Sequence, residues 1–125
     1  MKIFSVEEAN SLLPTVRHIV RKIQRAHTQI MSHQNEAKRA AEYSEQGGGG
    51  IADGVTYAAH LMDMTALVGE VEALGVQLKD FSRGLIDFPS LRDGRVVLLC
   101  WQLGEGDRLE WWHDVEAGFA GRTPL

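Results

Sequence analysis

The fold of this chain is decided by the stretch Arg92-Asp93-Gly94-Arg95-Val96-Val97-Leu98-Leu99-Cys100-Trp101. Its Asp-Gly pair tolerates the positive φ angles of a type I′ turn, so the stretch predicts a tight β-hairpin. The apolar run over 96–101 has no polar face, which predicts a central strand covered on both sides.

Shorter strand signals flank this hairpin within a C-terminal block over 84–125. Upstream, Leu85 to Phe88 predicts a short strand that Pro89 limits, because proline cannot donate to a strand ladder. Downstream, Gly104 to Asp107 predicts a turn, and Arg108 to Trp112 alternates like a third strand. The block is therefore predicted to form a three-stranded antiparallel meander.

A helix is predicted immediately before this block, from about Val55 to Arg83. Its apolar face is wider than a single partner helix would cover. We expect two neighbours for it: the preceding helix, and either the C-terminal sheet or another subunit. The seam of this helix consists of His60, Met64, Leu67, Val71, Leu74, Leu78 and Phe81.

The N-terminal region predicts further helix. Ser5 and Glu8 have the spacing of a capping box, so a helix should begin at about Val6. Pro14 predicts a break at Leu13 and a second, longer helix that starts at the proline; a kink within one continuous helix is the alternative. The seam that follows has three–four spacing and consists of Val16, Val20, Ile23, His27, Ile30, Gln34, Ala37 and Ala41.

Four consecutive glycines, Gly47 to Gly50, end the helical pattern and predict a linker over 46–54. The two long helices on either side should then pack antiparallel. We predict a single α+β domain over 1–125: a long antiparallel helical hairpin with a short N-terminal helix over 5–83, followed by the small meander.

Composition limits the classes of function. The net charge of −4 argues against a protein that coats nucleic acid, which needs a basic surface. The single cysteine excludes an internal disulfide and fits a reducing cytoplasm. No stretch approaches the roughly 20 apolar residues of a membrane span. The composition therefore predicts a cytoplasmic protein without membrane contact.

Several short motifs resemble one bacterial family. They are Phe4 with Glu8-Ala9-Asn10 and Leu13-Pro14, Gly84-Leu85-Ile86-Asp87-Phe88-Pro89, Leu99-Cys100-Trp101 with Gly104-Glu105, and Trp112-His113 with Gly118-Phe119 and Gly121-Arg122. Together they resemble the family known as domain of unknown function 2203 over nearly the whole chain. The resemblance implies a small bacterial cytoplasmic protein and transfers no catalytic residues.

The first candidate site is a divalent metal centre formed by His113, Glu116, Glu105 and Cys100. Imidazole and carboxylates suit zinc or a harder divalent ion, and a thiolate favours zinc. The alternative is structural: His113 is a hydrogen-bonding residue at the end of the third strand, and Cys100 is a small core residue.

The second candidate is a ligand site around Arg122, with Asp87 and Trp101 as further contributors. Glycines on both sides of the tail allow close approach, and arginine binds carboxylate or phosphate in a bidentate manner. The alternative is that Arg122 pins the tail to an internal carboxylate such as Asp87 or Glu116.

A basic stripe of Arg17, Arg21 and Arg25 lies on one face of the predicted second helix. Like charges four residues apart repel, so an RNA backbone, a membrane surface or acidic side chains should compensate. Pairing of the hairpin places Asp80 opposite Arg21, and the net acidic charge favours solvation or internal pairing.

Two classes of function follow. The first is a non-enzymatic homo-oligomeric binding or scaffold protein, most simply a homodimer that joins two hairpins into a four-helix arrangement. The second is a small metal-dependent enzyme or sensor with a site around His113, Glu116, Glu105 and Arg122. Neither specifies the small-molecule or protein partner.

Overall fold

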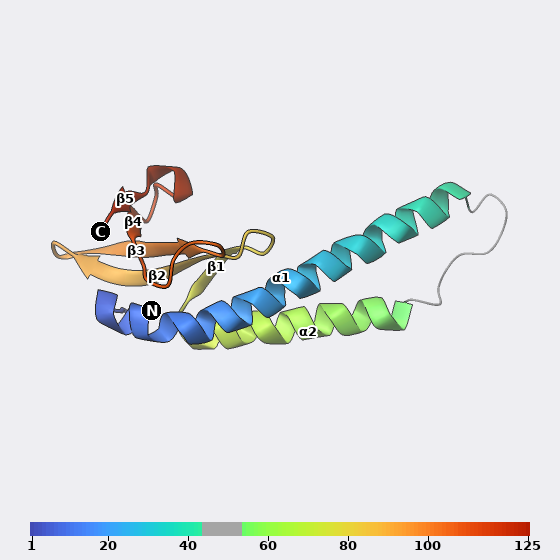
Figure 1. Cartoon of the computed structure of the whole chain (residues 1–125), viewed down its shortest axis with the longest axis horizontal. Helices are drawn as coiled ribbons and strands as arrows, with labels where there is room; N and C mark the ends of the chain where they lie inside the picture. Colours follow the sequence, from blue (N-terminus) through green and yellow to red (C-terminus); the bar gives the residue numbers. More distant parts are fainter. Residues whose placement is uncertain (44–53) are drawn as a thin grey trace.

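The computed structural model describes residues 1–43 and 54–125, and it combines two antiparallel helices with a five-stranded antiparallel sheet (Figure 1). The predicted α+β class and the helical hairpin are confirmed. Except for Gly54, the predicted linker over 46–54 lies outside the described residues. Neither of these helices is long and apolar enough to cross a membrane, among the residues described.

Helix α1 runs without interruption over Val6–Tyr43. The capping box is confirmed, because the Glu8 amide donates to Ser5 Oγ at 3.0 Å and the Ser5 amide donates to Glu8 Oε1 at 3.3 Å. The predicted break at Leu13 is wrong, and the continuous-helix alternative is correct. Pro14 points to solvent while its neighbours Leu13 and Val16 are fully buried, so their packing holds both halves of the helix on one core.

Replacing Pro14 with alanine is expected to stabilise the protein, by up to about 3 kcal/mol. Alanine restores the amide donor that proline lacks at this position of α1, and the exposed site has room for the change. Urea unfolding followed by circular dichroism measures the effect. An unchanged or lower midpoint would show that the proline is already accommodated without cost.

Helix α2 spans Gly54–Ala73 and ends ten residues before the predicted terminus at Arg83. Gly75 takes the left-handed conformation at φ 88°, its amide donates to the Glu72 carbonyl at 2.9 Å, and the Val76 amide donates to the Val71 carbonyl at 3.3 Å. These two bonds form a Schellman motif, which turns the chain out of the helix. The predicted seam residues Leu78 and Phe81 therefore belong to a strand and the turn after it.

The sheet has the strand order β1-β2-β3-β4-β5, with every neighbouring pair antiparallel. The strands are β1 Gln77–Asp80, β2 Leu85–Arg92, β3 Arg95–Gln102, β4 Trp111–Asp114 and β5 Thr123–Pro124. The predicted hairpin turn is confirmed, with φ values of 52° at Asp93 and 79° at Gly94. The predicted meander corresponds to β2, β3 and β4, although β4 begins three residues later than Arg108, and the sheet gains β1 and β5 at its edges.

Pro89 does not limit β2, contrary to the prediction. Strand β1 pairs only with residues 85–87 of β2, so no strand lies beside Pro89 on that edge. The missing amide of Pro89 therefore costs no ladder bond there. The N-terminal segment covers this edge: the Phe4 amide donates to the Pro89 carbonyl at 2.7 Å, and Ser90 Oγ donates to the Phe4 carbonyl at 2.6 Å.

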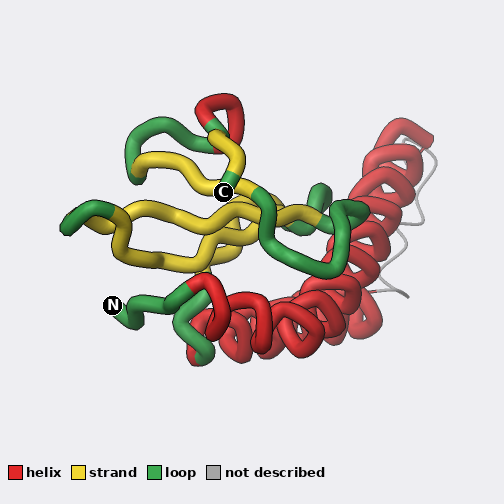
Figure 2. The backbone as a smooth tube through the Cα atoms, turned by 60° about the vertical axis from the view of Figure 1, so that its left-hand side comes forward, coloured by secondary structure: helices red, strands yellow, loops and turns green. Residues whose placement is uncertain are grey.

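The two faces of the sheet have different covers. One face packs on the helices and forms the core, in which Phe88 and Trp101 meet Leu13 and Val16 of α1. The C-terminal segment that carries β5 and the 3-10 helix η3 (Phe119–Gly121) lies on the side of the sheet away from the helices (Figures 1 and 2). A second, smaller interior therefore exists between the sheet and this segment.

Candidate metal centre

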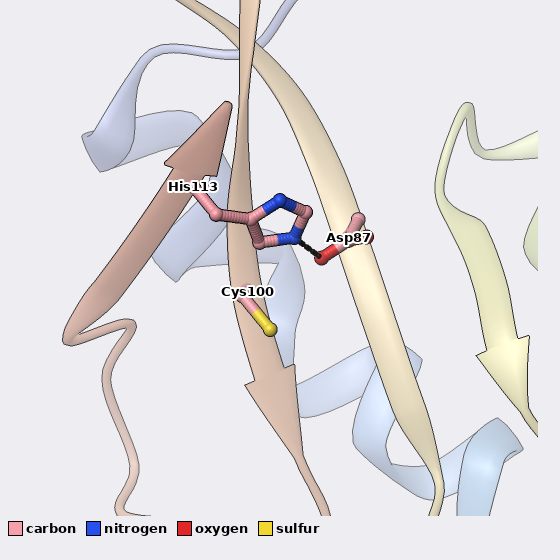
Figure 3. A group of neighbouring side chains, drawn as sticks. All are labelled: Asp87, Cys100 and His113. Carbon is pink, nitrogen blue, oxygen red and sulfur yellow. Dashed lines mark hydrogen bonds and ion pairs between the residues drawn. The ribbon is translucent and has the colours of Figure 1, made fainter. Parts of the chain in front are cut away.

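Three polar side chains meet on the face of the sheet that points away from the helices. Asp87 of β2 lies directly opposite Cys100 of β3, and His113 of β4 lies opposite Leu98, two residues from Cys100. Because paired residues share a face and side chains alternate along a strand, all three project from the same face (Figure 3).

These side chains are close together and almost fully buried. The Nε2 atom of His113 lies 3.0 Å from Oδ1 of Asp87, and one ligand atom from each of the three residues lies within 4.8 Å of the others. Their exposed fractions are 2% for Asp87, 1% for Cys100 and 2% for His113. Buried ionisable groups are costly unless paired, so this cluster is a specific feature of the interior.

The orientation of the His113 ring is fixed by two acceptors. Its Nδ1 lies 2.8 Å from the Asp114 carbonyl oxygen, which only accepts, so Nδ1 carries a hydrogen. Its Nε2 faces the Asp87 carboxyl group. A neutral imidazole has one N–H, so two flanking acceptors require a second proton, shared between Nε2 and the carboxyl group. A metal ion could take the place of this proton only if the two groups moved slightly apart.

Burial above all, together with the neighbouring Asp87 charge, raises the pKa of the Cys100 thiol to about 12, while the Arg122 guanidinium acts in the opposite direction. Nη1 of Arg122 lies 4.0 Å from the Cys100 sulfur. The thiolate is the nucleophilic form of cysteine, so a neutral, buried thiol does not support cysteine-nucleophile catalysis.

In metal-free protein, Cys100 is expected to react with a thiol reagent at pH 8 about 1,000-fold more slowly than an exposed cysteine, because its thiolate is scarce. Its raised pKa also gives a stabilising contribution that is complete below pH 9.0, the ordinary value, and lost as the pH rises to about 12. Ellman's reagent, with and without denaturant, measures the first effect. Equal rates in both conditions would contradict the burial of the thiol.

Arg122 closes the C-terminal segment over this cluster. Its Nη1 donates to both carboxylate oxygens of Glu105, at 3.0 and 2.9 Å, and Oε1 of Glu105 also accepts from the Gln102 amide at 2.8 Å. The guanidinium carbon lies 4.0 Å from the centre of the Phe119 ring and 4.9 Å from that of Trp111. The tail is thus held by a charge-assisted contact and two cation–π contacts.

The family model described as uncharacterized conserved protein, DUF2203, matches residues 2–125. The chain belongs to this family. No curated protein and no solved structure matches it. The family assignment confirms the resemblance drawn from the motifs along nearly the whole chain, and the Asp87, Cys100 and His113 positions all fall inside the matched range of this DUF2203 chain.

The structure brings together only part of each predicted site. Cys100 and His113 meet as the metal hypothesis expected, and Asp87, predicted as a ligand contact, completes their cluster. Glu105 pairs with Arg122 beside the cluster, and Glu116 is exposed in the turn after β4. The expectation that Arg122 pins the tail to a carboxylate fits the geometry, with Glu105 as the acceptor.

Trp101 and the residues of the basic stripe lie elsewhere. Trp101 projects from the opposite face into the helix-side core, where its exposed fraction is 1% and its Nε1 donates to the Gly106 carbonyl at 2.9 Å. In the basic stripe, Arg17 pairs with Asp107 at 2.6 Å. The expected partner of Arg21, Asp80, instead accepts from the amides of its own turn, and these bonds lower its pKa.

Proposed function

We propose that this DUF2203 protein binds a divalent transition metal, zinc above all, at Asp87, Cys100 and His113. The observation that carries the proposal is the mutual approach of three different ligand atoms within 4.8 Å in a buried site. A nitrogen, a sulfur and an oxygen ligand form a set that zinc accepts.

The spacing suits a single ion. Zinc–ligand bonds of about 2.0–2.3 Å place the ligand atoms of a tetrahedral site about 3.3–3.7 Å apart. The Nε2 to Oδ1 distance is 3.0 Å, so the histidine and aspartate need to separate only slightly to admit an ion. Three protein ligands leave one tetrahedral position for a ligand from outside the chain.

Charge and orientation support the same assignment. An Asp87 carboxylate and a Cys100 thiolate together neutralise a divalent ion, so the loaded site would carry no net buried charge. The Nδ1 hydrogen of His113 is held by the Asp114 carbonyl, which is the outer contact that metal-binding histidines usually have, and it leaves Nε2 as the ligand atom.

We assign the centre a binding or sensing role in preference to catalytic turnover. All three ligand residues are at most 2% exposed, and the segment held by Arg122 and Glu105 covers them. Three protein ligands with an open fourth position are also the pattern of catalytic zinc, but turnover needs substrate to reach that position, and the burial of all three ligands shelters it from solvent. A reducing compartment such as the cytoplasm suits the centre, since the ligand thiol must stay reduced.

The test is the metal content of protein purified without an affinity tag, with His113→Gln and Cys100→Ala as site variants. His18→Gln is the matched control, because His18 is exposed on α1. We expect close to one zinc per chain in the parent and control, and at least about 100-fold weaker zinc binding in both site variants, since even outer-shell contacts are worth 10–100-fold. Equal metal binding in folded parent and site variants would overturn the assignment.

Zinc binding to metal-free protein is expected to release about two protons, one from the Cys100 thiol and one shared by His113 and Asp87. Isothermal titration calorimetry at pH 7 in buffers of different ionisation enthalpy gives this count. Adventitious surface binding would release fewer protons and would persist in the Cys100→Ala variant.

A further inference from the structure

Helix α2 carries an apolar face that nothing in the described part of the chain covers. Only Val71 of this helix is buried, whereas Val55 is 83% exposed and Met62 is 72% exposed. The residues that pack toward α1, such as Tyr57 and Met64, lie on the other side of the helix. The exposed face consists of Val55, Ala59, Met62, Ala66, Gly69 and Ala73.

We propose that a second copy of this chain covers that face, with α2 packed antiparallel against the α2 of its partner. The six residues alternate in steps of four and three, which is the spacing of a helix seam that pairs with another helix. Apart from its chain neighbours and the backbone of its own helix, no described atom lies within 4 Å of a Cβ placed on Gly69, and small residues along the face permit a close helix approach.

The charges of α2 favour an antiparallel partner. The helix contains no Lys or Arg, and two of its three acids, Glu70 and Glu72, lie near its C-terminus, where the helix dipole is also negative. Neither forms an ion pair among the described residues. An antiparallel copy centred between Met62 and Ala66 places these acids beside the positive N-terminal end of the partner's α2, whereas a parallel copy places acid beside acid.

Basic residues lie where this arrangement needs them. The start of α2 lies beside Gln34 and Ala37 of α1, as the Gln34–Tyr57 hydrogen bond and the cleft that Ala37 and Tyr57 share establish. Lys38 and Arg39 are exposed on this part of α1 and form no ion pair within the described residues. The antiparallel copy brings Glu70 and Glu72 toward them.

The shape of the molecule allows this contact. The helical hairpin projects away from the sheet (Figure 1), so an antiparallel pair places the two sheets at opposite ends. A 20-residue helix is about 30 Å long and about 10 Å wide. The face therefore offers roughly 300 Å² per copy, less than the about 800 Å² of a standard interface, so the dimer is expected to dissociate in the micromolar range or above.

Sedimentation equilibrium from about 1 μM to about 1 mM tests the proposal. The parent is expected to dimerise, and Met62→Asp to weaken the dimer at least about tenfold, because a carboxylate would be buried beside Ala66 of the partner. Leu91→Asp is the matched control, since Leu91 is an exposed apolar residue of the β-hairpin, 61% exposed. A monomeric parent over the whole range, or a dimer that tolerates Met62→Asp, would overturn the proposal.

Cysteine cross-linking tests the direction of the helices, and the buried native Cys100 does not interfere. A mixture of Val55→Cys and Ala73→Cys proteins is expected to form disulfide-linked heterodimers. Val55→Cys protein alone is expected to stay uncross-linked, because its two copies would lie about 27 Å apart along the pair. Cross-linking of Val55→Cys with itself would overturn the antiparallel arrangement.

Discussion

Replacing Asp87 with alanine is expected to lower the free energy of unfolding by about 3–5 kcal/mol, measured by urea denaturation in the presence of a chelator. The change removes the carboxyl group 3.0 Å from His113 Nε2 and leaves the imidazole without its partner in a site that water does not reach. The loss is large because the remaining polar group keeps its full desolvation cost.

A double variant separates this cost from a general packing defect. Asp87→Leu combined with His113→Leu removes both polar groups and fills the space with apolar atoms, so it is expected to lie much closer to the parent than Asp87→Ala. If the double variant is as unstable as Asp87→Ala, the pair is not the origin of the loss. Neither variant should bind zinc, so the stability and metal measurements report on the same cluster independently.

Replacing Trp101 with alanine is expected to cost about 3–5 kcal/mol. The indole ring is 1% exposed within the helix-side core, and its Nε1 donates to the Gly106 carbonyl at the turn before β4. Alanine leaves a cavity between the sheet and α1 and also removes that hydrogen bond. Thermal and urea unfolding should both show the decrease.

Trp101→Phe is the matched control, because phenylalanine keeps most of the apolar volume and loses only the indole N–H. Its expected cost is about 1–2 kcal/mol. Zinc binding should survive in folded Trp101→Phe, since this side chain projects from the face opposite the metal cluster. If Trp101→Phe lost zinc binding but kept its stability, Trp101 would have the ligand-binding role that the sequence suggested.

Two of the three residues of the candidate site can be placed in one site from the sequence. Cys100 and His113 are the only cysteine and the only histidine of the C-terminal block, so their residue types alone marked them. Asp87 joins them because β2 and β3 pair in a register that places it opposite Cys100. The Asp93-Gly94 turn fixes that register, and counting outward from the turn would have identified Asp87 as the third member.

Glu105 and Glu116 have the chemical type of metal ligands and lie near His113 in the sequence, but strand geometry separates them from the cluster. Glu116 follows β4 into an exposed turn, and Glu105 is held by Arg122 and by the Gln102 amide. A helical turn over 113–116 would have placed His113 and Glu116 on one face. The chain is a strand and then a turn there, so the three-residue spacing does not bring them together.

Local chemistry in the sequence determined several elements by itself. The Ser5–Glu8 capping box begins α1, the Asp93-Gly94 pair makes the tight hairpin, and the apolar run over 96–101 forms the central strand β3. The capping box and the turn depend on interactions within a few residues, and the apolar composition of 96–101 marks β3, so the sequence specifies these elements without knowledge of the rest of the chain.

Other features of the fold and the site were decided only by the tertiary structure. Packing of Leu13 and Val16 on the sheet keeps α1 continuous at Pro14. Pairing with β2 makes residues 77–80 a strand. Three adjacent strands bring Asp87, Cys100 and His113 together. These outcomes rest on contacts between segments far apart in sequence, whose energies exceed local backbone preferences of a few kcal/mol or less.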